Sequence, residues 1–182
     1  ITSRLVGSEM CIRDRQQLDL EFEKENELKF SDYIQMIKYK TAVLLGSSLK
    51  MGGIINDVNE TDLESLYDIG INLGLAFQIQ DDYLDLFGDQ NLIGKKIGGD
   101  IIKRKKTVMY HVFKEISDEG DSLTLEQLYN DSNSDDGSKI QKVFELFKNA
   151  NVDVKTKDLV KNYSTKAINL SLIHISEPTR RL

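Results

Sequence analysis

A short run of carboxylates and amides has the residue types and the spacing of a metal site. Residues 77–85 read Phe-Gln-Ile-Gln-Asp-Asp-Tyr-Leu-Asp. On a helix, Asp81 and Asp85 lie one turn apart on the same face, and Gln78 lies one turn before Asp81. Carboxylates held this close repel one another unless a cation compensates their charge. Oxygen ligands suit Mg²⁺, which is typically held by one or two carboxylates together with phosphate oxygens.

Basic and glycine residues near this run would suit an anionic ligand. Carboxylates could hold the metal of a metal–diphosphate, while ammonium groups hold the diphosphate. Glycine residues would let the backbone come close to the phosphate oxygens. Upstream, Lys40 and Thr41 interrupt an apolar helical stripe, where a lysine either extends to solvent or meets an anion. A solvated acidic face remains the alternative for the Asp-rich pattern alone. The downstream lysines are Lys95, Lys96, Lys103, Lys105 and Lys106.

Two long helices are expected to carry most of these residues. Apolar residues recur at helical spacing over 33–49 and again over 63–87, which predicts two helices with one buried stripe each. Ser31 and a capping box that begins at Thr61 predict where the two helices start. Gly88 is a stop signal for the second helix.

The rest of the chain also has helical spacing, and no strand alternation is present. Asp100 predicts the start of a basic helix that runs to about residue 117. Three shorter helices are expected near 125–128, 140–147 and 159–168, and residues 131–137 are expected to form a polar loop. The sequence therefore predicts an all-α class, as one domain or part of one.

Composition narrows the classes of function. The chain has 182 residues, a net charge of −6, and 40% hydrophobic residues. The acidic balance argues against a nucleic acid as partner, and no apolar run approaches the length of a membrane span. Without a secretory signal in the sequence given, we expect a cytoplasmic protein. A single proline, where about nine would be typical, favours long uninterrupted helices.

The two ends of the chain differ from the middle. Residues 1–15 and 172–182 hold five of the six arginines, none of the 18 lysines, the only cysteine and the only proline. They resemble translated adapter sequence, so we predict that both ends are non-native and exclude them from the fold. The middle, residues 16–171, is expected to be the C-terminal half of a larger domain.

The middle resembles the trans-isoprenyl diphosphate synthases, the family that includes farnesyl and geranylgeranyl diphosphate synthases. The matching strings are QQLDLEFE at 16–23, YIQMIKYKTAVLL at 33–45, LGLAFQIQDDYLDLFGD at 73–89, and GKKIGGDI with KKT within 94–107. The resemblance implies part of a helical isoprenoid-synthase bundle. It also implies a prenyltransferase that condenses an allylic diphosphate with isopentenyl diphosphate after Mg²⁺-assisted ionisation. A homodimer is implied for the full-length protein.

The resemblance also implies roles for individual residues. Asp81 and Asp85 would be Mg²⁺ ligands, with Asp82 as a ligand or as support for them. Lys40, Thr41 and Gln78 would act on the reacting end of the allylic substrate. The remaining residues would bind or position substrate. These are Lys40 again, with Lys96, Lys105, Gln16 and Asp19.

One departure from the family pattern bears on activity. The family has a first aspartate-rich motif that binds the other Mg²⁺ ions, and the 182 residues contain only the DDxxD at 81–85. We therefore expect the parent protein to be an enzyme and this chain alone to be inactive. Half a bundle should also leave apolar faces exposed, for example at Leu44, Leu45 and Leu49.

Other interpretations stay open at this point. A non-catalytic helical regulatory or binding subunit related to the family is the main alternative, and a terpene cyclase is the nearest enzymatic one. Asp131, Asn133 and Asp135 follow the spacing of a calcium loop, but Asp136 replaces the required glycine and Lys142 the required glutamate. His111, the only histidine of the middle, is expected to be a packing or surface residue.

Overall fold

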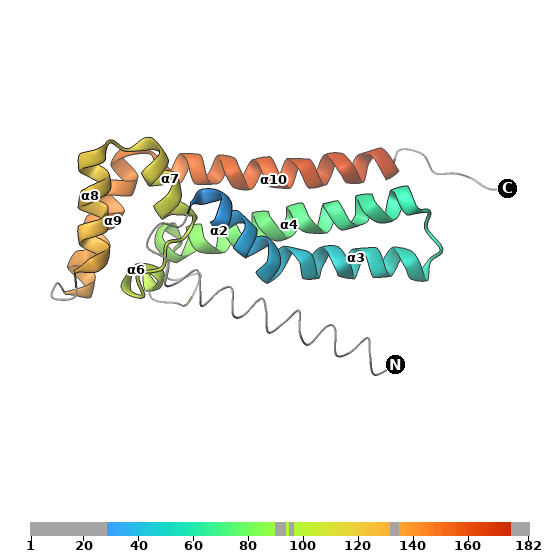
Figure 1. Ribbon diagram of the computed structural model, residues 1–182, viewed down its shortest axis with the longest axis horizontal. Helices are drawn as coiled ribbons and strands as arrows, with labels where there is room; N and C mark the ends of the chain where they lie inside the picture. Colours follow the sequence, from blue (N-terminus) through green and yellow to red (C-terminus); the bar gives the residue numbers. More distant parts are fainter. Residues whose placement is uncertain (1–28, 90–93, 95–96, 132–134, 176–182) are drawn as a thin grey trace. The chain divides into compact units, whose positions relative to one another are not determined.

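The protein is built from helices throughout the part of the chain that the structure describes. The computed structural model describes residues 29–89, 94, 97–131 and 135–175 (Figure 1). No strand occurs in these residues, so the predicted all-α class is confirmed. The elements are α2 (Phe30–Ile37), η1 (Lys38–Ala42), α3 (Val43–Ile55), α4 (Glu60–Phe87), α6 (Gly99–Ile102), α7 (Val108–Ile116), α8 (Glu119–Asn130), α9 (Asp136–Asn149) and α10 (Val152–Ile175).

The helices divide between two compact units. One unit contains the described residues 34–78 and 160–175, and the other contains 29–33 and 79–159. The helices α2, α4 and α10 each contribute residues to both units.

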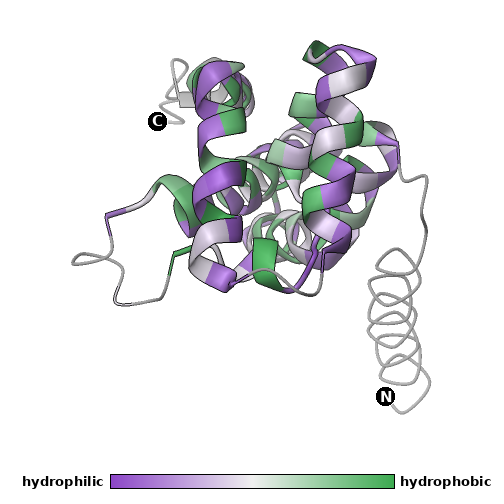
Figure 2. Ribbon diagram, turned by 90° about the vertical axis from the view of Figure 1, so that its left-hand side faces the viewer, coloured by the Kyte–Doolittle hydropathy of each residue, from purple (hydrophilic) through white to green (hydrophobic). Residues whose placement is uncertain are grey.

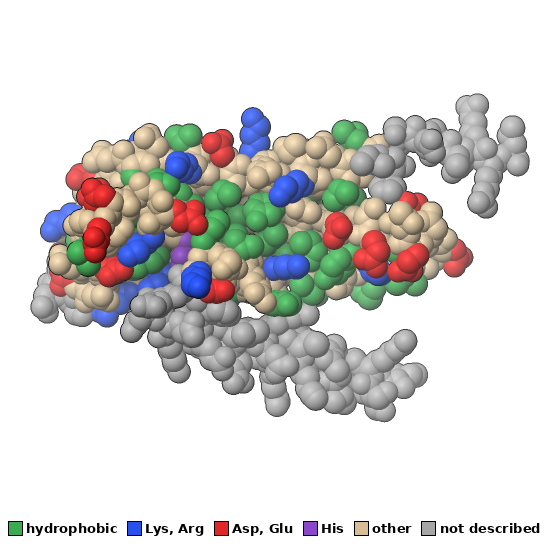
Figure 3. Space-filling model, turned by 45° about the horizontal axis from the view of Figure 1, so that its top comes forward, with side chains coloured by type: hydrophobic (Ala, Val, Ile, Leu, Met, Phe, Trp, Pro, Cys, Tyr) green, Lys and Arg blue, Asp and Glu red, His purple; other side chains and the backbone are tan. Residues whose placement is uncertain are grey.

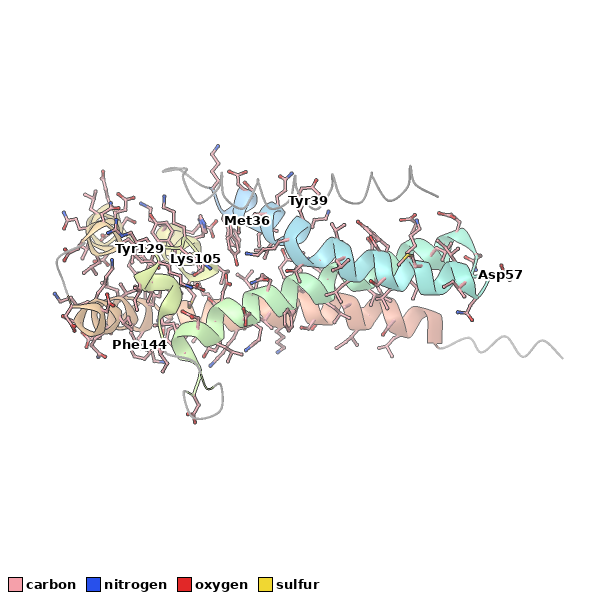
Figure 4. The ribbon with its side chains drawn as sticks, turned by 90° about the horizontal axis from the view of Figure 1, so that it is seen from below. Met36, Tyr39, Asp57, Lys105, Tyr129 and Phe144 are labelled. Atoms are coloured by element: carbon pink, nitrogen blue, oxygen red, sulfur yellow. The ribbon has the colours of Figure 1, made fainter. Side chains whose placement is uncertain are left out.

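In the first unit, small residues let α4 pack closely against η1 and α3. A Cβ built on Gly74 would lie 2.4 Å from the Cα of Ala42, and one built on Gly70 would lie 2.5 Å from the Cα of Gly46. Such distances leave no space for a side chain, so the two backbones meet along this line. The turn between α3 and α4 contains Asp57, which has a positive φ of 53° (Figure 4).

The segment between α2 and α3 is a π-helical turn. Residues Lys38–Ala42 form η1, and helical backbone continues directly on both sides of it. The long helix expected over 33–49 is therefore confirmed, but its register changes in the middle. Single π turns inside α-helices occur frequently at functional sites, and this turn contains Lys40 and Thr41.

In the second unit, aromatic and aliphatic side chains form the core. Phe113 and Phe147 lie with ring centroids 5.5 Å apart, and Tyr110 and Tyr129 lie 5.0 Å apart. Gly98 has a positive φ of 77°, and a Cβ on it would lie 2.7 Å from Cγ1 of Ile140 in α9. Figure 2 faces α8 and α9, where hydrophilic and hydrophobic segments alternate along the ribbon, as expected for helices with one buried face.

The predicted helix ends are close to the observed ones, but their caps differ. The α4 helix begins at Glu60 rather than at the capping box of Thr61, because Asn59 accepts the Asp62 amide at 3.0 Å. At α2, the carboxylate of Asp32 accepts the backbone N–H of Lys29 at 3.2 Å, so Ser31 lies inside the helix. The end of α4 at Phe87 confirms Gly88 as its stop signal.

The prediction of one basic helix from Asp100 to about residue 117 was wrong. The segment forms α6 and α7, separated by a turn in which Arg104 has a positive φ of 58°. The amide of Lys105 donates to the carbonyl of Asp100 at 2.9 Å, which closes this turn. The three later helices are confirmed, and the last is longer than expected, because α10 has 24 residues.

Large apolar side chains are exposed on the first unit, as expected for Leu44, Leu45 and Leu49. Their exposed fractions are 63%, 40% and 37%. The space-filling view shows hydrophobic side chains gathered on the surface (Figure 3). None of the helices in the described part of the chain has the length and apolar character needed to cross a membrane.

Candidate functional site

Asp82 is a buried carboxylate that ties three helices of the second unit together. Its side chain is 7% exposed. The hydroxyl of Tyr33, from α2, donates to its Oδ2 atom, and so does the backbone N–H of Val108, the first residue of α7, at 3.3 Å. A carboxylate this deep is stable only when hydrogen bonds replace its water. Burial, then the charge and hydrogen bond of Asp82, raise the pKa of Tyr33, which therefore remains a donor.

Asp85, one residue before the last apolar pair of α4, is held by the first turn of α6 and by Gly98, the residue before that helix. Its Oδ2 atom accepts the backbone N–H of Asp100 at 3.0 Å. Its carbonyl accepts the backbone N–H of Gly98 at 2.7 Å. The two bonds fix both the side chain and the backbone of Asp85 against the start of α6.

Among the described residues, two carboxylates and one ammonium group act on the charge of Asp85. Lys105 forms an ion pair with Asp100 at 3.3 Å (Lys105 is labelled in Figure 4). Burial raises the pKa of Asp85, and the charges of Asp100 and Asp81 raise it further, whereas the Asp100 amide and Lys105 lower it. Burial is the main cause of the rise in the Asp85 pKa, and repulsion by Asp100 and Asp81 adds to it. A bound cation would relieve that repulsion.

The donor set suits a hard divalent cation that keeps part of its hydration shell. Asp81 is exposed on α4, one turn before the half-buried Asp85. Across the described residues, no three His, Cys, Asp or Glu side chains are arranged to enclose a metal ion. Two carboxylates would leave the other coordination positions to water and ligand oxygens, which is the arrangement that Mg²⁺ prefers.

The first unit brings together two of the other predicted residues. The hydroxyl of Thr41, in η1, donates to Oε1 of Gln78, in α4, at 3.0 Å. The close contact of Ala42 with Gly74, one turn before Gln78, explains why these side chains meet. Lys40 is exposed in the same turn, and Phe77 is 63% exposed. The predicted residues Gln16, Asp19 and Lys96 lie outside the described residues.

Tyr33 and Asp100 hold two carboxylates of the site by hydrogen bonds, to Asp82 and to Asp85, and the sequence alone does not assign them to it. In the sequence, Tyr33 is one residue of an apolar stripe, and Asp100 has the pattern of a helix cap. The position of Asp100 directly after Gly98-Gly99 was the available signal for it. His111 is 3% exposed and packs against Tyr33 with ring centroids 5.3 Å apart, so the prediction of a packing residue is confirmed.

Comparison with known proteins places these features in a family. The model of the family described as polyprenyl synthetase matches residues 7–147, which include every residue of the second unit's carboxylate cluster. This chain belongs to the polyprenyl synthetase family. The chain is also 35% identical over 180 residues to a geranylgeranyl diphosphate synthase of Saccharolobus solfataricus, covering 97% of this chain and 53% of that protein.

Solved polyprenyl synthetase structures have the same fold over the matched part. A geranylgeranyl pyrophosphate synthetase from Pyrococcus horikoshii aligns with a TM-score of 0.80 and 34% identity, over 91% of this chain and 50% of that chain. A polyprenyl synthase from Caulobacter crescentus, solved with calcium and isoprenyl diphosphate, aligns with a TM-score of 0.81 and 27% identity, over 93% and 51%. This chain spans about half the length of the curated relatives that it matches.

Proposed function

We propose that this chain forms the diphosphate-binding half of a trans-prenyltransferase. In the whole enzyme, an allylic diphosphate and isopentenyl diphosphate would be the substrates, and the allylic one would ionise before the new carbon–carbon bond forms. The membership of the polyprenyl synthetase family supports the reaction class. The observation that carries the proposal for this chain is the pair Asp81 and Asp85, with Asp85 oriented by the Asp100 amide at 3.0 Å.

Asp81 and Asp85 would hold Mg²⁺ through one oxygen or more each. When bound, Mg²⁺ supplies positive charge that stabilises the leaving diphosphate. Lys105, paired with Asp100 at 3.3 Å, would add a cation that can turn toward phosphate oxygens, since an ammonium group rotates freely on a flexible stem. Asp82, fixed by Tyr33 and Val108, would support the direction of its two neighbours.

Residues of the π turn and Gln78 would act on the allylic substrate. Lys40 would bind the allylic diphosphate, and the oxygens of Thr41 and Gln78 would lie near the carbon that becomes positive. Their mutual hydrogen bond supports this, because it aligns two polar side chains before any substrate arrives. Lys96, Gln16 and Asp19 complete the proposed set of substrate-binding residues.

Ligand-dependent stabilisation tests the proposed site in this chain. With Mg²⁺ and inorganic diphosphate at about ten times their apparent Kd, the melting temperature should rise by about 3–5 °C. Asp81→Asn or Asp85→Asn should abolish the rise. The matched control is Asp68→Asn, which removes an exposed carboxylate from the same helix. An unchanged rise in both site variants, or no rise in the native chain, would refute the site.

We further propose that the 182-residue chain alone does not catalyse condensation and that the whole enzyme is a homodimer. The chain contains one DDxxD motif, and the resemblance to the family implies that the reaction uses a second one. Radiolabelled isopentenyl diphosphate should therefore give no Mg²⁺-dependent product with this chain. Product above the level of a metal-free control would overturn the claim of inactivity.

A non-catalytic binding subunit is the second candidate function. The exposed apolar residues of the first unit favour it, because a helical partner could cover them. They include Leu44, Ile54 and Ile55, which are 63%, 53% and 81% exposed. A subunit without chemistry should show no stabilisation by Mg²⁺ and diphosphate, so the same melting experiment separates the two functions.

A further inference from the structure

The hydrogen bond between Tyr33 and Asp82 joins two buried polar groups of the second unit. Tyr33 is 2% exposed and Asp82 is 7% exposed. The bond connects residues 49 positions apart in sequence, and both it and the Val108 amide reach the same oxygen, Oδ2. Charge-assisted bonds of this kind are stronger than neutral ones, so the carboxylate is held in one orientation.

The ring of Tyr33 is itself fixed by its neighbours. Phe30 stacks on it with an interplanar angle of 8° and a centroid distance of 6.4 Å. The buried imidazole of His111 lies 5.3 Å from it and 6.3 Å from Phe30. With aromatic rings packed around it in a close-packed interior, the hydroxyl has little freedom to move away from Asp82.

Fixing Asp82 also fixes the rotation of the second-unit part of α4 about its own axis. Asp82 adjoins Asp81 and lies one turn before Asp85 in spacing, so any rotation that moves one carboxylate moves all three. The Val108 amide holds the start of α7 to the same oxygen. The turn that carries Lys105 comes directly before α7.

We infer that Tyr33 is a positioning residue for the metal–diphosphate site, which it orients by anchoring Asp82 between Asp81 and Asp85. This inference rests on the proposed function, since it requires that Asp81 and Asp85 bind the metal. Tyr33 itself touches neither the metal nor the substrate. Its hydroxyl acts through Asp82, which adjoins the proposed ligands. Loss of a residue that orients metal ligands typically weakens metal affinity by about 10–100-fold.

A double-mutant cycle on the full 182-residue chain tests the inference. Mg²⁺ is titrated at fixed inorganic diphosphate, and the apparent affinity is taken from the rise in melting temperature. Tyr33→Phe should weaken the apparent Mg²⁺ affinity about tenfold. In the Asp82→Asn background the same change should have little further effect, because the anchored carboxylate is already gone. Tyr110→Phe is the control, since it removes a hydroxyl from a ring that also packs on His111.

The outcomes separate this inference from the proposed function. No response of the native chain to Mg²⁺ and diphosphate would refute the metal site itself. If the native chain responds and Tyr33→Phe keeps the native Mg²⁺ affinity, only the role of Tyr33 is refuted. The same holds if Tyr33→Phe weakens the Mg²⁺ affinity as much in the Asp82→Asn chain as in the native chain. If Tyr33→Phe lacks native helical circular dichroism, Phe30→Leu replaces it, because that variant keeps the hydroxyl and removes the stacked ring. It should weaken the affinity by a smaller factor, and native affinity in it would overturn the inference.

Discussion

Replacing Gly74 with alanine should separate α4 from the π turn and destabilise the protein. The new Cβ would lie 2.4 Å from the Cα and 2.7 Å from the Cβ of Ala42. Carbon atoms pack best at about 3.5–4.0 Å, so the backbones must move apart by about 1 Å. The nearest atoms belong to a helical backbone rather than to the end of a flexible side chain, so the strain cannot be relieved by a rotamer change.

The expected magnitude combines two opposing effects. Overpacking of this kind costs about 1–3 kcal/mol, and contact with backbone favours the upper end of that range. Alanine in a helix interior recovers about 1 kcal/mol relative to glycine. We therefore expect a net loss of about 2 kcal/mol for Gly74→Ala, accompanied by weakening of the Thr41–Gln78 hydrogen bond, since Gln78 lies one turn further along α4.

Gly52 in α3 provides the matched control. No atom lies within 4 Å of a Cβ built on it, so Gly52→Ala should stabilise the protein by about 0.5–1 kcal/mol. Urea unfolding followed by circular dichroism at 25 °C gives both free energies of unfolding. If Gly74→Ala matched or exceeded the native stability, the close packing of α4 on η1 would be refuted.

Three further perturbations test other contacts. Thr41→Val removes the donor to Gln78 and should cost about 1 kcal/mol in urea unfolding; native stability would contradict a formed bond. Burial lowers the pKa of His111 to about 4. As the pH falls, the imidazole is therefore protonated at a higher pH in the unfolded chain than in the folded one. Stability should fall by up to about 3 kcal/mol as pH drops from 6.5 to 4, and His111→Phe should flatten that part of the profile; an identical profile would refute the assignment. Asp118→Ala removes the cap that accepts the Asp121 amide at 2.8 Å and should cost about 1 kcal/mol, whereas Asp118→Asn should cost much less.

The long helices were predictable because their apolar stripes and stop signals are local. The π turn was not, because its register depends on the contact of Ala42 with Gly74, which are 32 positions apart. The break at Arg104 was missed for a similar reason. The Val108 amide donates to Asp82 in another helix, and helix periodicity carries no information about such a bond.

The site shows the same division between local and non-local information. The spacing predicts that Asp81 and Asp85 lie on one face, and the resemblance assigns roles to Thr41 and Gln78. In the structure the hydroxyl of Thr41 lies 3.0 Å from Oε1 of Gln78. Nothing in the spacing pairs Tyr33 with Asp82. A tyrosine in an apolar stripe is ordinarily a core residue, and only the fold reveals that its hydroxyl meets a buried carboxylate.

The left-handed turn at Gly98 has a consequence for which substitutions the chain can tolerate. Its amide donates to the carbonyl of Asp85, and Ile140 of α9 fills the space beside it. The packing of α9 against Gly98 therefore constrains the backbone that is hydrogen-bonded to Asp85. Only glycine satisfies both the backbone angle and the available space at position 98, and a bulkier residue at 140 would push the loop away from Asp85. Substitutions in α9 are therefore tolerated on its exposed face and limited both at its buried positions and at this contact with Gly98.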